Sequence, residues 1–89
     1  MKAVWKTNLT DCGPDLGRGM LVKLPVGAQV IAAQYQRGEL CVWSIVDTEA
    51  EMEDRRIYVV GTGRPVPDGV SYVDTIQDHR EVFVWHMFA

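Results

Sequence analysis

Cysteine is scarce in this chain of 89 residues, which holds only Cys12 and Cys41. Small secreted domains without a large core usually depend on several disulfides, and a single Cys12–Cys41 bridge is an alternative that nothing here requires. Cys41 lies in an apolar run and is expected to behave as a small buried hydrophobe. We expect no secretory signal either, because the apolar stretch near the start covers only residues 3–5. We therefore expect a cytoplasmic protein that is supported by homo-oligomerisation rather than by disulfides.

Long apolar runs and an excess of positive charge are missing as well. No segment approaches the roughly 20 apolar residues that a membrane-spanning helix needs. Lys and Arg total 9 against 12 Asp and Glu, for a net charge of −3, whereas binding to a nucleic-acid backbone requires a basic surface. We expect neither a membrane nor a nucleic-acid polymer as partner. A local basic pocket for a small anionic ligand remains compatible with the overall acidity.

No segment has helical periodicity, and what the chain has instead is alternation. Polar and apolar residues alternate, with many β-branched and aromatic side chains, and this pattern predicts β-strands. About six to seven short, mostly antiparallel strands are expected in one domain over residues 1–89, which makes the fold all-β, a small sandwich or barrel. The segments concerned are residues 2–9, 20–24, 29–36, 39–47, 55–60, 71–77 and 82–88.

Several of these segments have predicted partners. The longest apolar stretch breaks at Arg37-Gly38, which predicts a hairpin of residues 29–36 with 39–47 in which Gly38 supplies a positive φ. Residues 39–47 are apolar on both faces and are expected to be a central strand. The acidic segment Thr48–Asp54 is predicted to be a solvated loop, with one helical turn as the alternative. The last strand follows a turn at Asp78–Glu81, and it lies centrally or at a subunit contact.

Groups suited to catalysis are few. The two histidines are His79, in a predicted turn, and His86, in a predicted strand. They belong to no closely spaced set of histidine, cysteine and carboxylate ligands of the kind that a metal site needs. A cysteine nucleophile would require a positioned base, and an approach of His86 to Cys41 is the one speculative pairing. We expect no enzyme, no metal and no cofactor.

The segment GTGRPVP, Gly61 to Pro67, is the one suggestive motif. Glycines let a backbone approach a ligand closely, successive N–H groups can form an anion-binding nest, and Arg64 offers a guanidinium for phosphate. The dinucleotide-binding glycine motif, however, opens a helix, which Pro65 and Pro67 forbid. The alternative interpretation is that Gly61 and Gly63 only form a turn at the end of a strand.

A phosphate site at this motif would also recruit residues from elsewhere in the chain. Arg55 and Arg56 point to opposite faces of an extended strand, so at most one of them adds charge. A tryptophan, Trp43 or Trp85, would stack on a base, because each lies in a strand that is apolar on both faces. The predicted ligand-binding residues are therefore Trp43, Arg55, Arg56, Gly61, Thr62, Gly63, Arg64 and Trp85.

Six motifs in order, VWK, LPVGAQV, GELCVWSIVD, RxYVVGTGRPVP, YVDTIQ and FVWHMF, span nearly the whole chain. Their combination resembles a family of small proteins of tailed phages and prophages whose function is unknown. Thr10–Gly19 is longer and more irregular than that pattern. The resemblance implies a cytoplasmic accessory protein of phage type, and phage proteins of this size often counter host defence.

One anti-defence strategy that this context implies is a sponge. A small β-rich oligomer binds a nucleotide-type immune signal, such as a cyclic oligonucleotide or a cyclic ADP-ribose derivative, and withholds it without cleaving it. We expect such a sponge here. The alternative is a protein–protein interaction module that blocks a host or phage protein through Glu49–Asp54 and the aromatic C-terminal strand. A third, an enzyme that degrades the nucleotide, lacks a credible general base.

Overall fold

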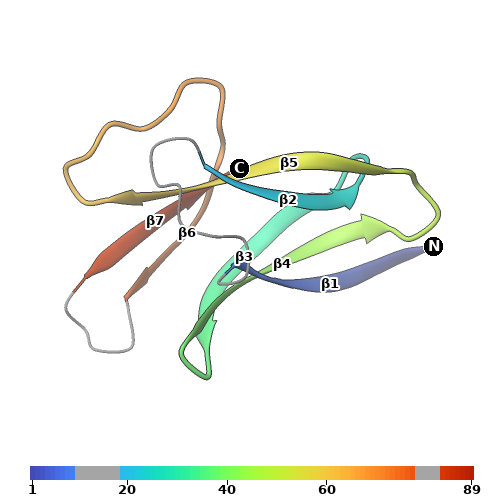
Figure 1. The fold of residues 1–89 in the computed structure, drawn as a ribbon, viewed down its shortest axis with the longest axis horizontal. Helices are drawn as coiled ribbons and strands as arrows, with labels where there is room; N and C mark the ends of the chain where they lie inside the picture. Colours follow the sequence, from blue (N-terminus) through green and yellow to red (C-terminus); the bar gives the residue numbers. More distant parts are fainter. Residues whose placement is uncertain (10–18, 78–82) are drawn as a thin grey trace.

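The computed structural model describes residues 1–9, 19–77 and 83–89, which form seven β-strands in two sheets (Figure 1). Every strand pair is antiparallel, and the described residues contain no α-helix. The three-stranded sheet, ordered β1-β4-β3, consists of β1 (Lys2–Asn8), β3 (Gln29–Gln36) and β4 (Glu39–Asp47). The four-stranded sheet, ordered β2-β5-β7-β6, consists of β2 (Met20–Pro25), β5 (Met52–Gly61), β6 (Tyr72–Gln77) and β7 (Val84–Phe88). The prediction of a small all-β fold is confirmed.

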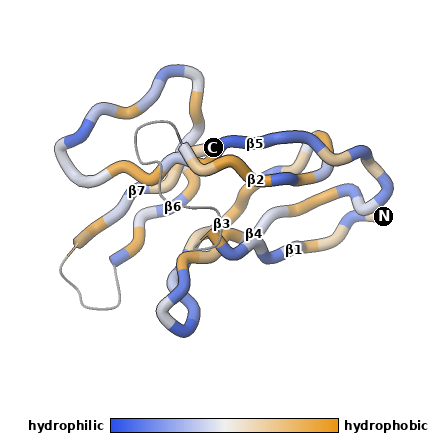
Figure 2. The backbone as a smooth tube through the Cα atoms, viewed as in Figure 1, coloured by the Kyte–Doolittle hydropathy of each residue, from blue (hydrophilic) through white to orange (hydrophobic). Residues whose placement is uncertain are grey.

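One hydrophobic core joins the two sheets. In β4, Val42, Ser44 and Val46 are fully buried, so every second residue faces inward, as the two-residue period of a strand requires. Met20 and Ile57, which are paired across β2 and β5, belong to the same core cluster. Apolar and hydrophilic stretches alternate within the strands, with the first half of β5 largely hydrophilic, and the tip of the β3–β4 hairpin is hydrophilic as well (Figure 2).

The two sheets meet where β3 runs beside β6. There the Asp74 carboxylate accepts a hydrogen bond from the backbone N–H of Ala33, with Oδ2 3.1 Å from the nitrogen. This position follows an irregularity of β3 between Val30 and Ala32. A side chain thus supplies the acceptor that a neighbouring strand would otherwise offer, and it fixes how the two sheets join.

The central hairpin was predicted correctly. β3 and β4 have the predicted bounds, and Gln36 pairs with Glu39 around a two-residue turn. Gly38 has the expected positive φ of 79°, and Arg37 has one as well, at 53°. Two positive φ values in succession are typical of the type I′ turns that match strand twist. β4 lies between β1 and β3, so its prediction as a central strand is confirmed.

The prediction for the acidic segment is wrong in its second half. β5 begins at Met52, not at Arg55, and residues 52–54 pair with residues 23–25 of β2. Asp54 forms an ion pair with Lys23 at 2.5 Å. The cross-strand lysine compensates the negative charge that argued against regular structure. Residues 48–50 do form a turn.

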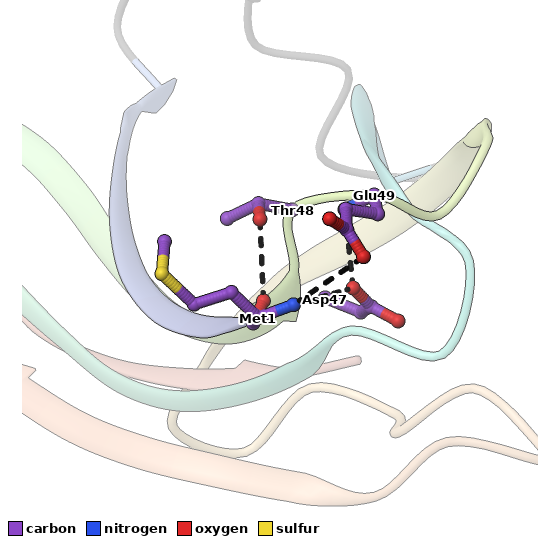
Figure 3. Close-up of polar contacts among 4 residues, drawn as sticks. All are labelled: Met1, Asp47, Thr48 and Glu49. Atoms are coloured by element: carbon purple, nitrogen blue, oxygen red, sulfur yellow. Dashed lines mark hydrogen bonds and ion pairs between the residues drawn. The ribbon is translucent and has the colours of Figure 1, made fainter.

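The start of the chain is fastened to that turn (Figure 3). The Met1 carbonyl accepts hydrogen bonds from the Thr48 N–H at 2.9 Å and from the Thr48 hydroxyl at 3.2 Å. The Met1 ammonium lies 3.4 Å from Asp47 Oδ1 and 3.8 Å from Glu49 Oε2. The pKa of Asp47 is lowered, mainly by the hydrogen bond from the Glu49 N–H; desolvation opposes this in part, and the Met1 ammonium lowers the pKa further.

The C-terminal hairpin is also confirmed. β6 and β7 are antiparallel, and β7 lies between β5 and β6, in agreement with the expectation of a central strand. The predicted turn at Asp78–Glu81 (with His79), the irregular segment before Gly19 and Cys12 lie outside the described residues. Cys41 is a free, buried thiol, as expected. The speculative pairing with His86 is not observed, because the Cys41 thiol donates to the Glu39 carbonyl and both ring nitrogens of His86 contact threonine hydroxyls.

Candidate functional site

A hollow of about 680 Å³ opens where β5 ends and the antiparallel β7 begins. This volume lies within the range of about 300–1,000 Å³ that is usual for small-molecule sites. Its wall is mostly apolar, and Arg64 is the charged side chain among the described lining residues. The residues that line the hollow are Val59, Val60, Gly61, Arg64, Pro65, Val66, Pro67 and Trp85.

Three of the predicted site residues come together here. Gly61 of β5 pairs with Trp85 of β7. A Cβ atom placed on Gly61 would lie 3.5 Å from Trp85 Cζ3 and 3.7 Å from Arg64 Cγ. The indole and the stem of the arginine therefore approach the same point of the backbone, which a glycine leaves open.

The loop after β5 begins with a tight turn. The Arg64 N–H donates to the Gly61 carbonyl at 3.0 Å, and Gly63 has a φ of 87°. A positive φ at the third residue, with none at Thr62, is the pattern of a type II turn. The Arg64 amide is therefore used within the turn and does not join an anion-binding nest. The two interpretations of this segment, a turn and a ligand-binding loop, are compatible, because the turn places the Arg64 side chain at the hollow.

The Arg64 guanidinium has no hydrogen bond or ion pair with any residue of the described ranges. Arg64 is also exposed. A guanidinium at the edge of an apolar hollow keeps five N–H donors for a ligand in a planar arrangement that suits phosphate or carboxylate. The arrangement thus offers one cation beside one aromatic ring.

Thr62 is not among the residues that line the hollow. Its hydroxyl lies 2.9 Å from Nε2 of His86, and Nδ1 of His86 lies 3.1 Å from the hydroxyl of Thr75. The Thr75 hydroxyl also contacts the Tyr72 hydroxyl at 2.8 Å. By strand alternation His86 faces away from the fully buried Met87. This chain of hydrogen bonds ties the first residue of the loop to β7 and β6.

Arg55 and Arg56 are not brought to the hollow. Arg55 donates to the Ala28 carbonyl at 2.8 Å and lies 3.8 Å from Glu53, so its charge is used in the fold. Arg56 pairs with Leu21 of β2 on the opposite face of β5. At about 3.3 Å per residue, it lies about 17 Å along the strand from Gly61. The expectation that one of them adds charge to the loop is not met.

The two candidate tryptophans separate. Trp43 pairs with Lys6 and Ala32 in the three-stranded sheet and lies on the face opposite the buried neighbours on either side of it. Only Trp85 lines the hollow. Phe83 was missed: its ring centroid lies 5.6 Å from that of Trp85, with 31° between the planes, and 56% of the residue is exposed. The alternation in FVWHMF places both rings on one face and could have revealed it.

Neither a metal centre nor a membrane span is found in the described parts of the chain. No group of three or more His, Cys, Asp or Glu residues there could hold a metal ion. Over the same residues, no helix is long and apolar enough to cross a membrane.

Comparison with known proteins gives a family whose function is unknown. A family model described as "Domain of unknown function (DUF7352)" matches residues 1–89. No curated protein and no solved structure matches the chain.

Proposed function

We propose, for a chain that belongs to the DUF7352 family of domains of unknown function, that it binds a nucleotide-type anionic molecule and withholds it without cleaving it. In this proposal the protein is a cytoplasmic accessory protein of phage type, and the ligand is an immune signal such as a cyclic oligonucleotide or a cyclic ADP-ribose derivative. The convergence of Gly61, Arg64 and Trp85 at one hollow is the observation that carries it.

The chemistry of this convergence suits a base joined to a phosphate. An indole offers a π-face to any base, a contact worth about 1–3 kcal/mol. A guanidinium that donates to a phosphate oxygen contributes about 1.5–3 kcal/mol. Pro65, Val66 and Pro67 add an apolar wall beside the guanidinium.

These contacts are too weak for sequestration by one protomer alone. One stack and one charge-assisted hydrogen bond total at most about 6 kcal/mol. Nanomolar binding, which a scarce signal requires, needs about 12 kcal/mol. The proposal therefore includes a homo-oligomer in which further contacts come from a second protomer, a ready solution for a chain of 10.0 kDa.

A binder is favoured over an enzyme by the surroundings of His86. Both ring nitrogens are occupied by threonine hydroxyls, and by strand alternation the ring points to the face opposite that of Trp85. A general base has to lie within about 3 Å of the proton that it removes. His86 is thus poorly placed to act on a ligand that is stacked on Trp85.

The test is retention of intact ligand. The protein is incubated with cyclic di- and trinucleotides and with cyclic ADP-ribose, separated from free ligand and denatured, and the released compound is identified by mass spectrometry. We expect one compound to be recovered unchanged by the wild type and by Arg56→Ala, and lost from Arg64→Ala. Arg56 is the matched control because the same charge is removed on the opposite face of β5.

Three results would contradict the proposal. If none of the compounds is retained, the protein is not a sponge for them. Recovery of a cleaved compound would make it an enzyme. Capture of one stoichiometric protein partner, without any small molecule, would favour the interaction module instead.

A further inference from the structure

The aromatic surface that begins with Trp85 in the hollow extends beyond it to Phe83. Trp85 lines the hollow, and Phe83 lies beyond Trp85 on the same face of the chain with its ring tilted by 31° against the indole. Met87, on that face in the other direction, is fully buried. The face thus changes from core at Met87 to a partly covered indole at Trp85, and then to a largely exposed ring at Phe83.

Phe83 is exposed in a way that the core does not explain. More than half of its surface is open, although its ring is held against Trp85. A phenyl ring contributes most to stability when it is buried. An exposed ring beside a ligand-sized hollow is typical of a binding surface, and its contact with Trp85 fixes its orientation in advance.

The charge beside these rings is limited. Arg64 is the one cation among the described residues that line the hollow. The nearest arginines along the strand are directed elsewhere, since Arg55 is bound to the Ala28 carbonyl and Arg56 lies on the other face. The described surface therefore presents two rings in succession and one guanidinium.

We propose that the site takes a dinucleotide-type ligand, cyclic or linear, with one base on Trp85, the second on Phe83 and one phosphodiester on Arg64. This inference rests on the proposed function and narrows it to dinucleotide-type ligands. The two ring centroids lie 5.6 Å apart with the planes tilted by 31°, and each ring can accept one base of a splayed pair. A mononucleotide uses only the first ring.

The test compares two ligands of equal charge. Adenylyl-(3′→5′)-adenosine has two bases and one phosphodiester, and the methyl ester of adenosine 5′-monophosphate has one base and the same single negative charge. Their dissociation constants are measured by calorimetry with the wild type, Phe83→Ala and Phe83→Tyr. We expect the wild type to bind the two-base ligand about five- to 150-fold more tightly, the range of one additional stack.

The variants show where a preference comes from. Phe83→Ala is expected to abolish the preference and leave binding of the methyl ester unchanged, and Phe83→Tyr is expected to retain the preference because its ring can still stack. Equal affinity of the wild type for both ligands overturns the inference, as does a preference that survives Phe83→Ala or a failure to bind the two-base ligand. Binding of the methyl ester in any of these cases leaves the proposed function standing. If neither of the two ligands nor any of the cyclic compounds binds, the inference and the proposed function are both contradicted.

Discussion

The two ends of β5 carry arginines in contrasting surroundings. Near its start, Arg55 is three-quarters covered, donates to the Ala28 carbonyl and lies near Glu53. Just beyond its end, Arg64 is exposed at the rim of an apolar hollow and has no polar partner among the described residues. The comparison teaches that sequence proximity does not make a cluster: one arginine is bonded within the fold, and the other keeps an exposed guanidinium.

The largest expected effect is a difference in the free energy of unfolding between alanine variants of the two arginines. Arg55→Ala leaves the Ala28 carbonyl without its donor, and loss of a charge-assisted hydrogen bond of this kind costs about 1.5–3 kcal/mol. Arg64→Ala removes an exposed side chain and is expected to stay within about 0.5 kcal/mol of the wild type. Urea denaturation measures both values. A larger loss for Arg64→Ala than for Arg55→Ala would reverse the assignment.

A methyl group at Gly61 tests whether a ligand approaches the backbone between Trp85 and Arg64. Gly61 has no positive φ, so alanine is compatible with its backbone. The new methyl group would lie between Trp85 and Arg64, at ordinary contact distance from both. We expect Gly61→Ala to weaken binding about tenfold, the effect of a modest misplacement of the two groups (about 1.4 kcal/mol), with stability nearly unchanged. Unchanged affinity, measured by calorimetry, would show that the ligand does not approach this point.

The hydrogen bond of Thr62 tests how the loop is held. Thr62→Val keeps the shape of the side chain and removes the contact with His86, so we expect a loss of about 0.5–1.5 kcal/mol in the free energy of unfolding. Thr75→Val, which loses contacts with both His86 and Tyr72, is the matched comparison and is expected to cost at least as much. If the denaturation curves of both variants coincide with that of the wild type, these hydrogen bonds do not stabilise the loop.

The smallest expected effect lies at the turn after β4. The folded pKa of Asp47 is lowered, so its contribution is present above the unfolded pKa of about 3.9 and is lost as the pH falls through the lower folded value. Asp47→Asn should therefore be less stable than the wild type near neutral pH, and the difference in their free energies of unfolding should shrink below about pH 4. Acid titration of both proteins measures this difference. A difference that grows toward low pH would contradict the assigned cause.

Local pattern was sufficient to predict the hairpin around Gly38, because strand period and turn chemistry are both local. The early start of β5 was not predictable in the same way, since Asp54 depends on Lys23 from another strand. The same limit applied to the site. Alternation gives the face of a strand on which Trp43 and Trp85 lie, but not the sheet to which the strand belongs.

The most direct test of the central claim is to identify which tryptophan indole changes its NMR signal when a ligand binds. The chain has three tryptophans, and their indole N–H groups give separate peaks in a ¹⁵N–¹H correlation spectrum. On titration with a compound that the protein retains, the account predicts that the Trp85 peak shifts with saturation, while those of Trp43 and Trp5 stay in place. A shift of Trp43 with an unmoved Trp85 would contradict it, because the ligand would then bind the other sheet.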